Sequence, residues 1–271
     1  MKAMVLAAGL GTRLRPLTEE TPKALLPVAG RPLIHYPLLL LKRYGITDIV
    51  MNLHHHGKKI VDALGDGRAL GLRLHYSWEP AILGTGGGIK QARRLLGDTT
   101  FLVINSDILI DLNLDKVVEF HHRRKAAVSM VVRTDADAAR YGAIELDGQD
   151  RIRTIIGRGG RGERGSDEAG TLRQLMFTGV HILEPSVFDA IPGHGFSSIT
   201  DVYIAMLQKD ERLFGYVMKG AWMDLGTPEC YEEANRLLRS GQLKLPYLKA
   251  TNPAARGAVE TPRNTSKRRA D

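Results

Sequence analysis

The 271-residue sequence predicts an α/β fold in which helices cover both faces of a mixed, mostly parallel sheet. Short apolar runs alternate with segments whose apolar side chains recur at helical spacing. The first run, residues 2–8, continues without polar alternation to a glycine, which is typical of a strand buried on both faces. With 43% hydrophobic residues, the chain can fill the core that such a sheet requires.

The first half of the chain alternates strand and helix regularly. The opening strand gives way at Gly9 to a loop that extends to about Arg31. Pro32 suits the first turn of a helix, and the helical spacing after it ends at Gly45. We expect strands at 2–8, 48–53, 72–77 and 101–105 and helices at 32–44, 57–65 and 87–97. This order predicts right-handed crossovers between parallel strands.

The second half is less regular. We expect helices at 114–124 and 197–208, and a closing helix from Thr227 to about Gly241. Strands are expected at 126–132, 141–148, 151–156, 175–183 and 213–218. Residues 157–170 contain six glycines and almost nothing apolar, so we expect a flexible loop there.

The formal net charge of +8 is concentrated in two places. From residue 250 onward five basic residues stand against two acidic ones, and 151–173 holds six arginines against three acidic residues. Each segment contributes +3, which leaves about +2 for the rest of the chain. Because no basic helix or aromatic-rich basic strand remains, we expect no nucleic-acid partner. Phosphorylated small molecules remain candidate partners.

Cysteine content and hydropathy indicate a cytoplasmic protein. The single cysteine, Cys230, can form neither an intrachain disulfide nor a multi-thiolate metal site. The apolar start of the chain is too short for the core of a signal peptide. The run LIHYPLLLL, broken by His35 and Pro37, falls well short of the roughly 20 apolar residues of a membrane helix. We therefore expect no membrane partner.

The loop after the first strand combines glycines with basic residues, at the sheet edge where ligands bind in such folds. Gly9 and Gly11 let backbone amides approach a phosphate, and Arg13 offers a planar fork that matches phosphate oxygens. Neither the dinucleotide fingerprint nor the P-loop pattern is present, and a glycine pair alone equally suits an ordinary turn. The prolines around Lys23 stiffen the loop, which favours a rigid anion site.

Two segments of this loop, AAGLGTRLRPLT at 7–18 and TPKALLPVAGRPLI at 21–34, resemble the signature of sugar-1-phosphate nucleotidyltransferases, also called nucleotide-sugar pyrophosphorylases. The resemblance continues to about residue 240. It implies a Rossmann-like nucleotidyltransferase domain at 1–241, followed at 242–271 by a basic tail that we expect to be disordered. The implied reaction is attack of a sugar 1-phosphate oxygen on the α-phosphorus of a nucleoside triphosphate, with release of pyrophosphate and with Mg²⁺ as cofactor.

The resemblance assigns roles to residues of the loop. Arg13 would neutralise the leaving pyrophosphate, and Lys23 would bridge the phosphates of the two substrates. Positioned cations suit this chemistry because charge builds up on both phosphates in the transition state. The triphosphate would be cradled by Ala7, Ala8, Gly9, Gly11 and Thr12.

Two further segments would complete the nucleotide site. Asp107 follows a strand at the ligand edge, and Asp224 lies in WMDLGT, so the resemblance implies that both hold Mg²⁺, an ion that prefers carboxylates plus phosphate oxygens and water. Taken alone, either aspartate also suits a turn or a helix cap. The nucleobase would lie against Glu79, Gly84 and Thr85, where the glycine-rich turn leaves bare backbone.

The acceptor side follows the family pattern less closely. Gly142, Thr178 and Arg158 are the candidate sugar-phosphate ligands, with Arg158 replacing a lysine that many relatives carry. The implied substrates are a nucleoside triphosphate and a sugar 1-phosphate, with activity most similar to mannose-1-phosphate guanylyltransferases. N-acetylmuramate 1-phosphate uridylyltransferase, a glucose-1-phosphate nucleotidyltransferase and a catalytically silent regulatory paralogue stay open, as does the choice between monomer and homodimer.

Overall fold

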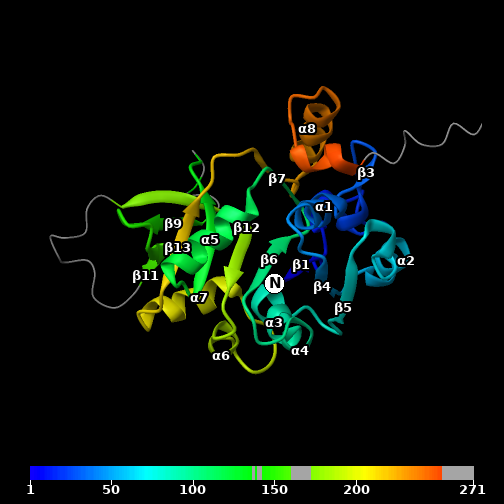
Figure 1. Cartoon of the computed structure of the whole chain (residues 1–271). Coiled ribbons are helices and arrows are strands. Elements are labelled where there is room, and N and C mark those ends of the chain that lie inside the picture. The colour runs from blue at the N-terminus through cyan, green and yellow to red at the C-terminus, as the bar shows by residue number, and fades with distance from the viewer. Residues whose placement is uncertain (136–137, 139–141, 160–171, 252–271) are drawn as a thin grey trace, which may run out of the picture.

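The computed structural model describes residues 1–135, 138, 142–159 and 172–251 and is built around one ten-stranded sheet (Figure 1). Its strand order is β11-β10-β9-β12-β6-β1-β4-β5, and β8 joins β12 to β13. The strands of this sheet are β1 (Lys2–Leu6), β4 (Asp48–Leu53), β5 (Arg73–Trp78), β6 (Phe101–Asn105), β8 (Val128–Arg133), β9 (Ala143–Leu146), β10 (Ile152–Ile155), β11 (Arg158–Gly159), β12 (Arg173–Leu183) and β13 (Leu213–Val217). The predicted mixed α/β fold is confirmed.

Helices cover both faces of the sheet, as expected. Adjacent residues of β1 point to opposite faces, so Val5 packs with one hydrophobic core and Met4 with the other. One core includes side chains of α1 (His35–Arg43), α2 (Gly57–Leu64), α5 (Leu114–Arg124) and α8 (Pro228–Arg239). The other includes side chains of α3 (Gly84–Gln91), α4 (Arg93–Leu96), α6 (Val187–Ala190) and α7 (Ile199–Gln208).

The direction of the strands changes at β6. β6, β1, β4 and β5 are parallel neighbours, so their carboxyl ends meet at one edge. β12 runs antiparallel to β6 on the other side and also pairs with β8 and β9. The ligand edge therefore lies between a parallel half and a largely antiparallel half of the fold.

Two helix starts differ from the sequence-based expectation. Helix α1 begins at His35 rather than Pro32, because Pro27–Val28 (β2) and Arg31–Pro32 (β3) form a small hairpin first. Helix α3 begins at Gly84 rather than residue 87, and the chain turns into the separate α4 after Ala92.

Sequence patterning also missed a two-stranded ribbon. Residues Ile108–Ile110 (β7) pair antiparallel with Trp222–Asp224 (β14), outside the main sheet. Each strand has only three residues, too few to show a periodicity.

The chain remains ordered beyond the expected domain boundary at residue 241. Leu245 and Tyr247 are each only 4% exposed, and the 3₁₀ helix Pro246–Thr251 packs against α1. The expectation of a disordered tail that begins at residue 242 is therefore corrected for residues 242–251. Residues 252–271 lie outside the described residues. The flexible loop expected at 157–170 is corrected at its start, because Arg158–Gly159 (β11) pairs with β10, and residues 160–170 lie outside the described residues.

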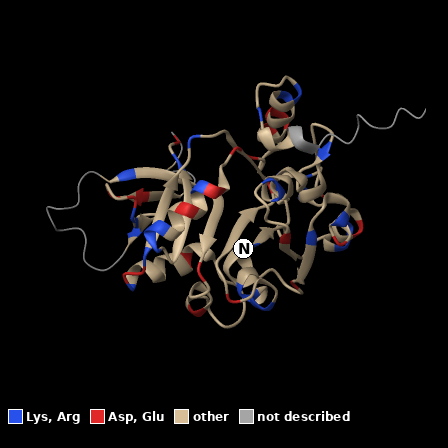
Figure 2. Cartoon of the chain, in the orientation of Figure 1, with Lys and Arg blue, Asp and Glu red and all other residues tan. Residues whose placement is uncertain are grey.

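Basic and acidic residues are intermixed over both halves of the fold in the described ranges (Figure 2). None of the helices within the described ranges combines the length and the apolar character needed to cross a bilayer.

Tyr247 tests whether the segment after residue 241 belongs to the folded domain. Tyr247→Ala is expected to lower the free energy of unfolding by about 3 kcal/mol, because it removes a buried aromatic side chain. Lys244→Ala, at an exposed position of the same segment, should change it by less than about 0.5 kcal/mol. Chemical denaturation measures both, and equal effects would contradict the assignment.

A buried histidine links stability to pH. His181 Nδ1 lies 2.5 Å from the Tyr203 hydroxyl, and burial lowers the pKa of His181 from 6.5 to about 3. Between these two values the unfolded chain binds a proton that the folded chain does not, so this contribution to stability is lost as pH falls below about 6.5.

We expect His181→Gln to flatten the decline in stability between pH 6 and pH 4 by up to about 1.4 kcal/mol per pH unit. His122→Gln, at an exposed position, is the matched control and should keep the wild-type slope. Urea titrations at several pH values measure the slopes. An unchanged slope in the His181 variant would refute the linkage.

Candidate active site

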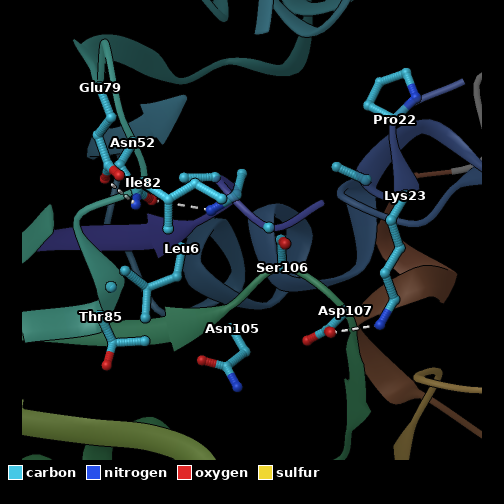
Figure 3. A pocket seen from close by; sticks show the side chains of 15 residues that line it. Leu6, Pro22, Lys23, Asn52, Glu79, Ile82, Thr85, Asn105, Ser106 and Asp107 are labelled. Carbon is cyan, nitrogen blue, oxygen red and sulfur yellow. Dashed lines mark hydrogen bonds and ion pairs between the residues drawn. The ribbon is translucent and has the colours of Figure 1, made fainter. Parts of the chain in front are cut away.

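A cleft opens at the carboxyl ends of β1 and β6, and it encloses about 800 Å³ together with its open mouth. Figure 3 shows Asn52 and Glu79 at one end of it and Lys23 and Asp107 at the other. Its walls are formed by Leu6, Ala7, Ala8, Gly9, Pro22, Lys23, Ala24, Asn52, Glu79, Ile82, Gly84, Thr85, Asn105, Ser106 and Asp107. Parallel packing of β1 and β6 thus brings the loop after each strand to one site, as the sequence predicts.

At one end of the cleft, Lys23 forms an ion pair with Asp107. Lys23 begins a 3₁₀ helix, Lys23–Leu25, and Asp107 lies between β6 and β7. Lys23 Nζ donates a hydrogen bond to Asp107 Oδ2 at 2.5 Å, and the two side chains are 13% and 25% exposed. Two predicted catalytic residues, 84 positions apart in the chain, are therefore in contact.

The β7–β14 ribbon brings Asp224 to the same place. Asp224 pairs with Ile108 in the ladder, and the Leu225 amide donates to the Asp107 carbonyl at 3.0 Å. Lys23 Nζ lies 4.0 Å from Asp224 Oδ1, within ion-pair range but too far for a hydrogen bond. Thr227, where the closing helix is expected to begin, caps α8 by accepting from the Cys230 amide.

The electrostatics of Asp224 fit a cation site. Burial raises the pKa of Asp224 and the nearby Asp107 raises it further, against opposing effects of Lys23, Arg13 and the Gly226 amide. Its Oδ1 atom is buried and has no hydrogen-bond partner. Two carboxylates, one with an orphaned oxygen, suit Mg²⁺, which takes one or two carboxylates and completes its shell with phosphate oxygens and water. No group of three or more metal-binding side chains occurs within the described residues.

The glycine loop leaves open space beside the cleft. Gly11 has φ +66°, a conformation that favours glycine, and its carbonyl accepts from the Thr18 hydroxyl. A Cβ on Gly9 would meet no atom within 4 Å, so the backbone there is accessible to a ligand. Thr12 begins a 3₁₀ helix, and Arg13 is exposed with its guanidinium against Gly226, two residues from Asp224. Arg13 thus lies near the carboxylates.

The nucleobase end contains a residue that sequence reasoning missed. Asn52 Oδ1 accepts from the Ala7 amide at 2.9 Å, and Asn52 Nδ2 donates to Glu79 Oε1 at 2.7 Å. The other Glu79 oxygen accepts from the Leu83 amide at 3.1 Å. Glu79 therefore lies at the predicted place, but both of its oxygens are already hydrogen-bonded. The available signal was Asn52 itself, a polar residue among the apolar side chains that follow Asp48 in β4.

The glycines from 84 onward have a packing role in the structure. A Cβ on Gly84 would lie 2.6 Å from the Ser197 carbonyl oxygen, and that oxygen accepts from the amides of Gly86 and Gly87. The Thr85 hydroxyl accepts from the Ile199 amide at the start of α7. The backbone of the glycine-rich turn, expected to be bare, is therefore already hydrogen-bonded at Gly86 and Gly87.

The three predicted acceptor residues lie apart. Gly142 has φ +88° and lines a second pocket, whereas Arg158 is paired with Asp201 at 2.9 Å and lines neither cavity. Thr178 is 1% exposed, and its hydroxyl donates to the Val131 carbonyl at 2.8 Å. The position of Gly142 in a pocket wall is compatible with contact to a ligand. The side chains of Thr178 and Arg158 instead contact other residues of the protein, Val131 and Asp201.

Comparisons of sequence place the chain among known proteins. A sequence model of the family described as nucleotidyl transferase matches residues 2–241. The chain is 38% identical to N-acetylmuramate alpha-1-phosphate uridylyltransferase of Neisseria meningitidis serogroup B, over 88% of this chain and 98% of that protein. It is 32% identical to mannose-1-phosphate guanylyltransferase of Mycobacterium tuberculosis, over 91% of this chain and 67% of that protein.

Solved structures share the fold. A Bacillus anthracis protein assigned as a glucose-1-phosphate thymidylyltransferase, crystallised with sucrose, has a TM-score of 0.75 and 26% identity over 88% of this chain and 95% of its own. HddC from Yersinia pseudotuberculosis, in complex with GMP-PN, has a TM-score of 0.71 and 24% identity over 88% of this chain and 99% of its own. The fold, the loop signature and the sequence matches agree, and this chain belongs to the nucleotidyl transferase family.

Proposed function

We propose that the protein transfers a nucleotidyl group from a nucleoside triphosphate to a sugar 1-phosphate and releases pyrophosphate. The arrangement of Lys23 carries this proposal: its ammonium lies 2.5 Å from Asp107 and 4.0 Å from Asp224 at one end of the cleft. A cation between two carboxylates, next to a loop with open backbone at Gly9, suits two phosphates that must approach each other.

The cleft indicates how the substrates would lie. The end formed by Asn52, Glu79 and Ile82 offers backbone and apolar surface to a base, and the triphosphate would extend along Gly9 toward Lys23. The Asn52–Glu79 hydrogen bonds fix that end before substrate binds, which lowers the entropic cost of positioning.

Lys23 and Arg13 would act on the reacting phosphates. Lys23 would contact the join between the sugar phosphate and the α-phosphate, and Arg13 the pyrophosphate side. Both compensate the charge that develops during in-line displacement, so no side-chain nucleophile is required. Asp107 and Asp224 would hold Mg²⁺, which supplies further neutralisation of phosphate charge when bound.

Sequence identity favours one acceptor class among the relatives. The N-acetylmuramate relative is matched over 98% of its length at 38% identity, whereas the mannose-1-phosphate relative is matched over 67% at 32%. Uridylyl transfer to N-acetylmuramate 1-phosphate is therefore the first reaction to test, with guanylyl transfer to mannose 1-phosphate second.

A pyrophosphate-release screen tests the function. ATP, CTP, GTP, UTP and dTTP are each combined with N-acetylmuramate, mannose, glucose and N-acetylglucosamine 1-phosphates in the presence of Mg²⁺. We expect turnover for at least one pair, and omission of the sugar phosphate should abolish it. If the folded protein turned over none of these substrate pairs, the proposed enzymatic activity would be contradicted and a catalytically silent paralogue favoured.

Asp107→Asn tests the carboxylate pair. We expect kcat to fall about 100-fold or more, because the variant loses a metal ligand and the anionic partner of Lys23. Asp111→Asn is the matched control, since Asp111 lies at the far end of the same ribbon, where its amide donates to the Ala221 carbonyl. It should keep most of the activity. Equal kcat values for wild type and Asp107→Asn, both with unchanged melting temperature, would refute the assignment.

A further inference from the structure

Helix α8 connects the two loops that supply Lys23 and Asp224 to the cleft. It begins just after the loop that holds Asp224, with Thr227 as its cap, and it contacts both β14 and the hairpin strand β2. That hairpin, β2–β3, begins four residues after Lys23. The helix therefore spans from the loop of the carboxylate to the loop of the lysine.

Two side chains of α8 fasten the hairpin. The Tyr231 hydroxyl donates to the Pro27 carbonyl at 2.6 Å, and Asn235 Oδ1 accepts from the Ala29 amide at 2.8 Å. Asn235 Nδ2 donates to the Tyr231 carbonyl at 2.9 Å, which determines that the oxygen of the side-chain amide faces the hairpin. These bonds join segments more than 200 positions apart in the chain.

The tip of the hairpin has a conformation that requires such support. Ala29 and Gly30 form its two-residue turn and have φ of +47° and +80°. Glycine adopts positive φ readily, whereas alanine rarely does. Both residues are exposed, so packing does not hold the turn, and the hydrogen bond from the Ala29 amide to Asn235 does. Strained backbone of this kind is concentrated at functional sites.

Backbone hydrogen bonds connect the hairpin to the turn of Lys23. The Leu26 amide donates to the Lys23 carbonyl at 3.1 Å, and the Leu33 amide donates to the Leu26 carbonyl at 3.0 Å. The Ile34 amide donates to the Ala24 carbonyl at 2.8 Å. A displacement of the hairpin would therefore displace the backbone of Lys23 with it.

We propose that Asn235 and Tyr231 are positioning residues for Lys23. Neither side chain lines the cleft, so each acts through the hairpin. By fixing the hairpin on α8, they fix the distance of the Lys23 ammonium from the two carboxylates and from the reacting phosphates. The inference rests on the proposed function, in which Lys23 contacts those phosphates.

Asn235→Leu tests the inference, because it keeps the approximate size of the side chain and removes the oxygen that accepts from Ala29. With the substrate pair chosen by the screen, kcat is expected to fall about tenfold, since small misplacements of a reacting group are costly. The KM of the triphosphate should stay within about twofold, because Asn52 and Glu79 are unchanged.

A measurement of competent protein separates misplacement from loss of fold. Calorimetric titration with a non-hydrolysable analogue of the triphosphate gives the fraction of protein that binds it, and kcat is expressed per binding site. The assays are run well below the melting temperature of each variant.

Three further variants locate the effect. Asn235→Asp keeps an oxygen opposite the Ala29 amide and should hold kcat within about threefold of wild type. Tyr231→Phe loses only the hydroxyl and should lower kcat about threefold or more. Ser240→Ala is the matched control, because the Ser240 hydroxyl donates to the Leu237 carbonyl at the far end of α8. It should leave kcat and KM unchanged.

The failures are distinguishable. A wild-type kcat per site in Asn235→Leu, or an equal loss in Asn235→Leu and Asn235→Asp, overturns this inference and leaves the proposed function standing. If Asn235→Leu does not fold, equal kcat values for Tyr231→Phe and Ser240→Ala overturn it in the same way. Absence of turnover by folded wild type with every substrate pair overturns the proposed function, and this inference with it.

Discussion

Backbone hydrogen bonds between β7 and β14 hold the candidate site together. Asp107 and Asp224 are separated by more than a hundred residues, and neither side chain could bring the other close against electrostatic repulsion. The ladder does so with neutral groups: the Leu225 amide bonds to the Asp107 carbonyl, and Lys23 then lies between the two carboxylates. The two carboxylates are held together by this ribbon, which in turn extends from the buried strand β6.

Close backbone approach is the second constraint. Gly179 leaves room for the Asn105 side chain, and Gly226 for the Arg13 guanidinium. Gly88 packs against the hydrogen-bonded pair of Asn52 and Glu79, where a Cβ would lie 2.6 Å from a Glu79 oxygen. These glycines let polar side chains pack in fixed positions along the cleft, so the cleft is shaped before a ligand enters.

Buried polar groups differ sharply between core and site. His121 contacts Ser129 at 2.9 Å and Glu184 at 3.0 Å, an arrangement that resembles a hydrolase triad. Ser129 is fully buried, so this group satisfies its own hydrogen bonds and has no access to a substrate. At the cleft, by contrast, Asp224 Oδ1 is buried without a hydrogen-bond partner, and its carboxyl has a raised pKa. The partner that Asp224 Oδ1 lacks is one that a bound cation can supply.

The alternating α/β order and the basic glycine loop at Gly9 and Arg13 are predictable from local signals in the sequence, namely periodicity and residue type. The two aspartates became candidates only through the resemblance to the family signature. Tertiary contacts, in contrast, are what orient Glu79 through Asn52, engage the Thr178 hydroxyl with the Val131 carbonyl, and bury Leu245 and Tyr247. These contacts depend on which segments far apart in the sequence pack together in the fold. Strands as short as β7 and β14 show no periodicity that would predict their pairing.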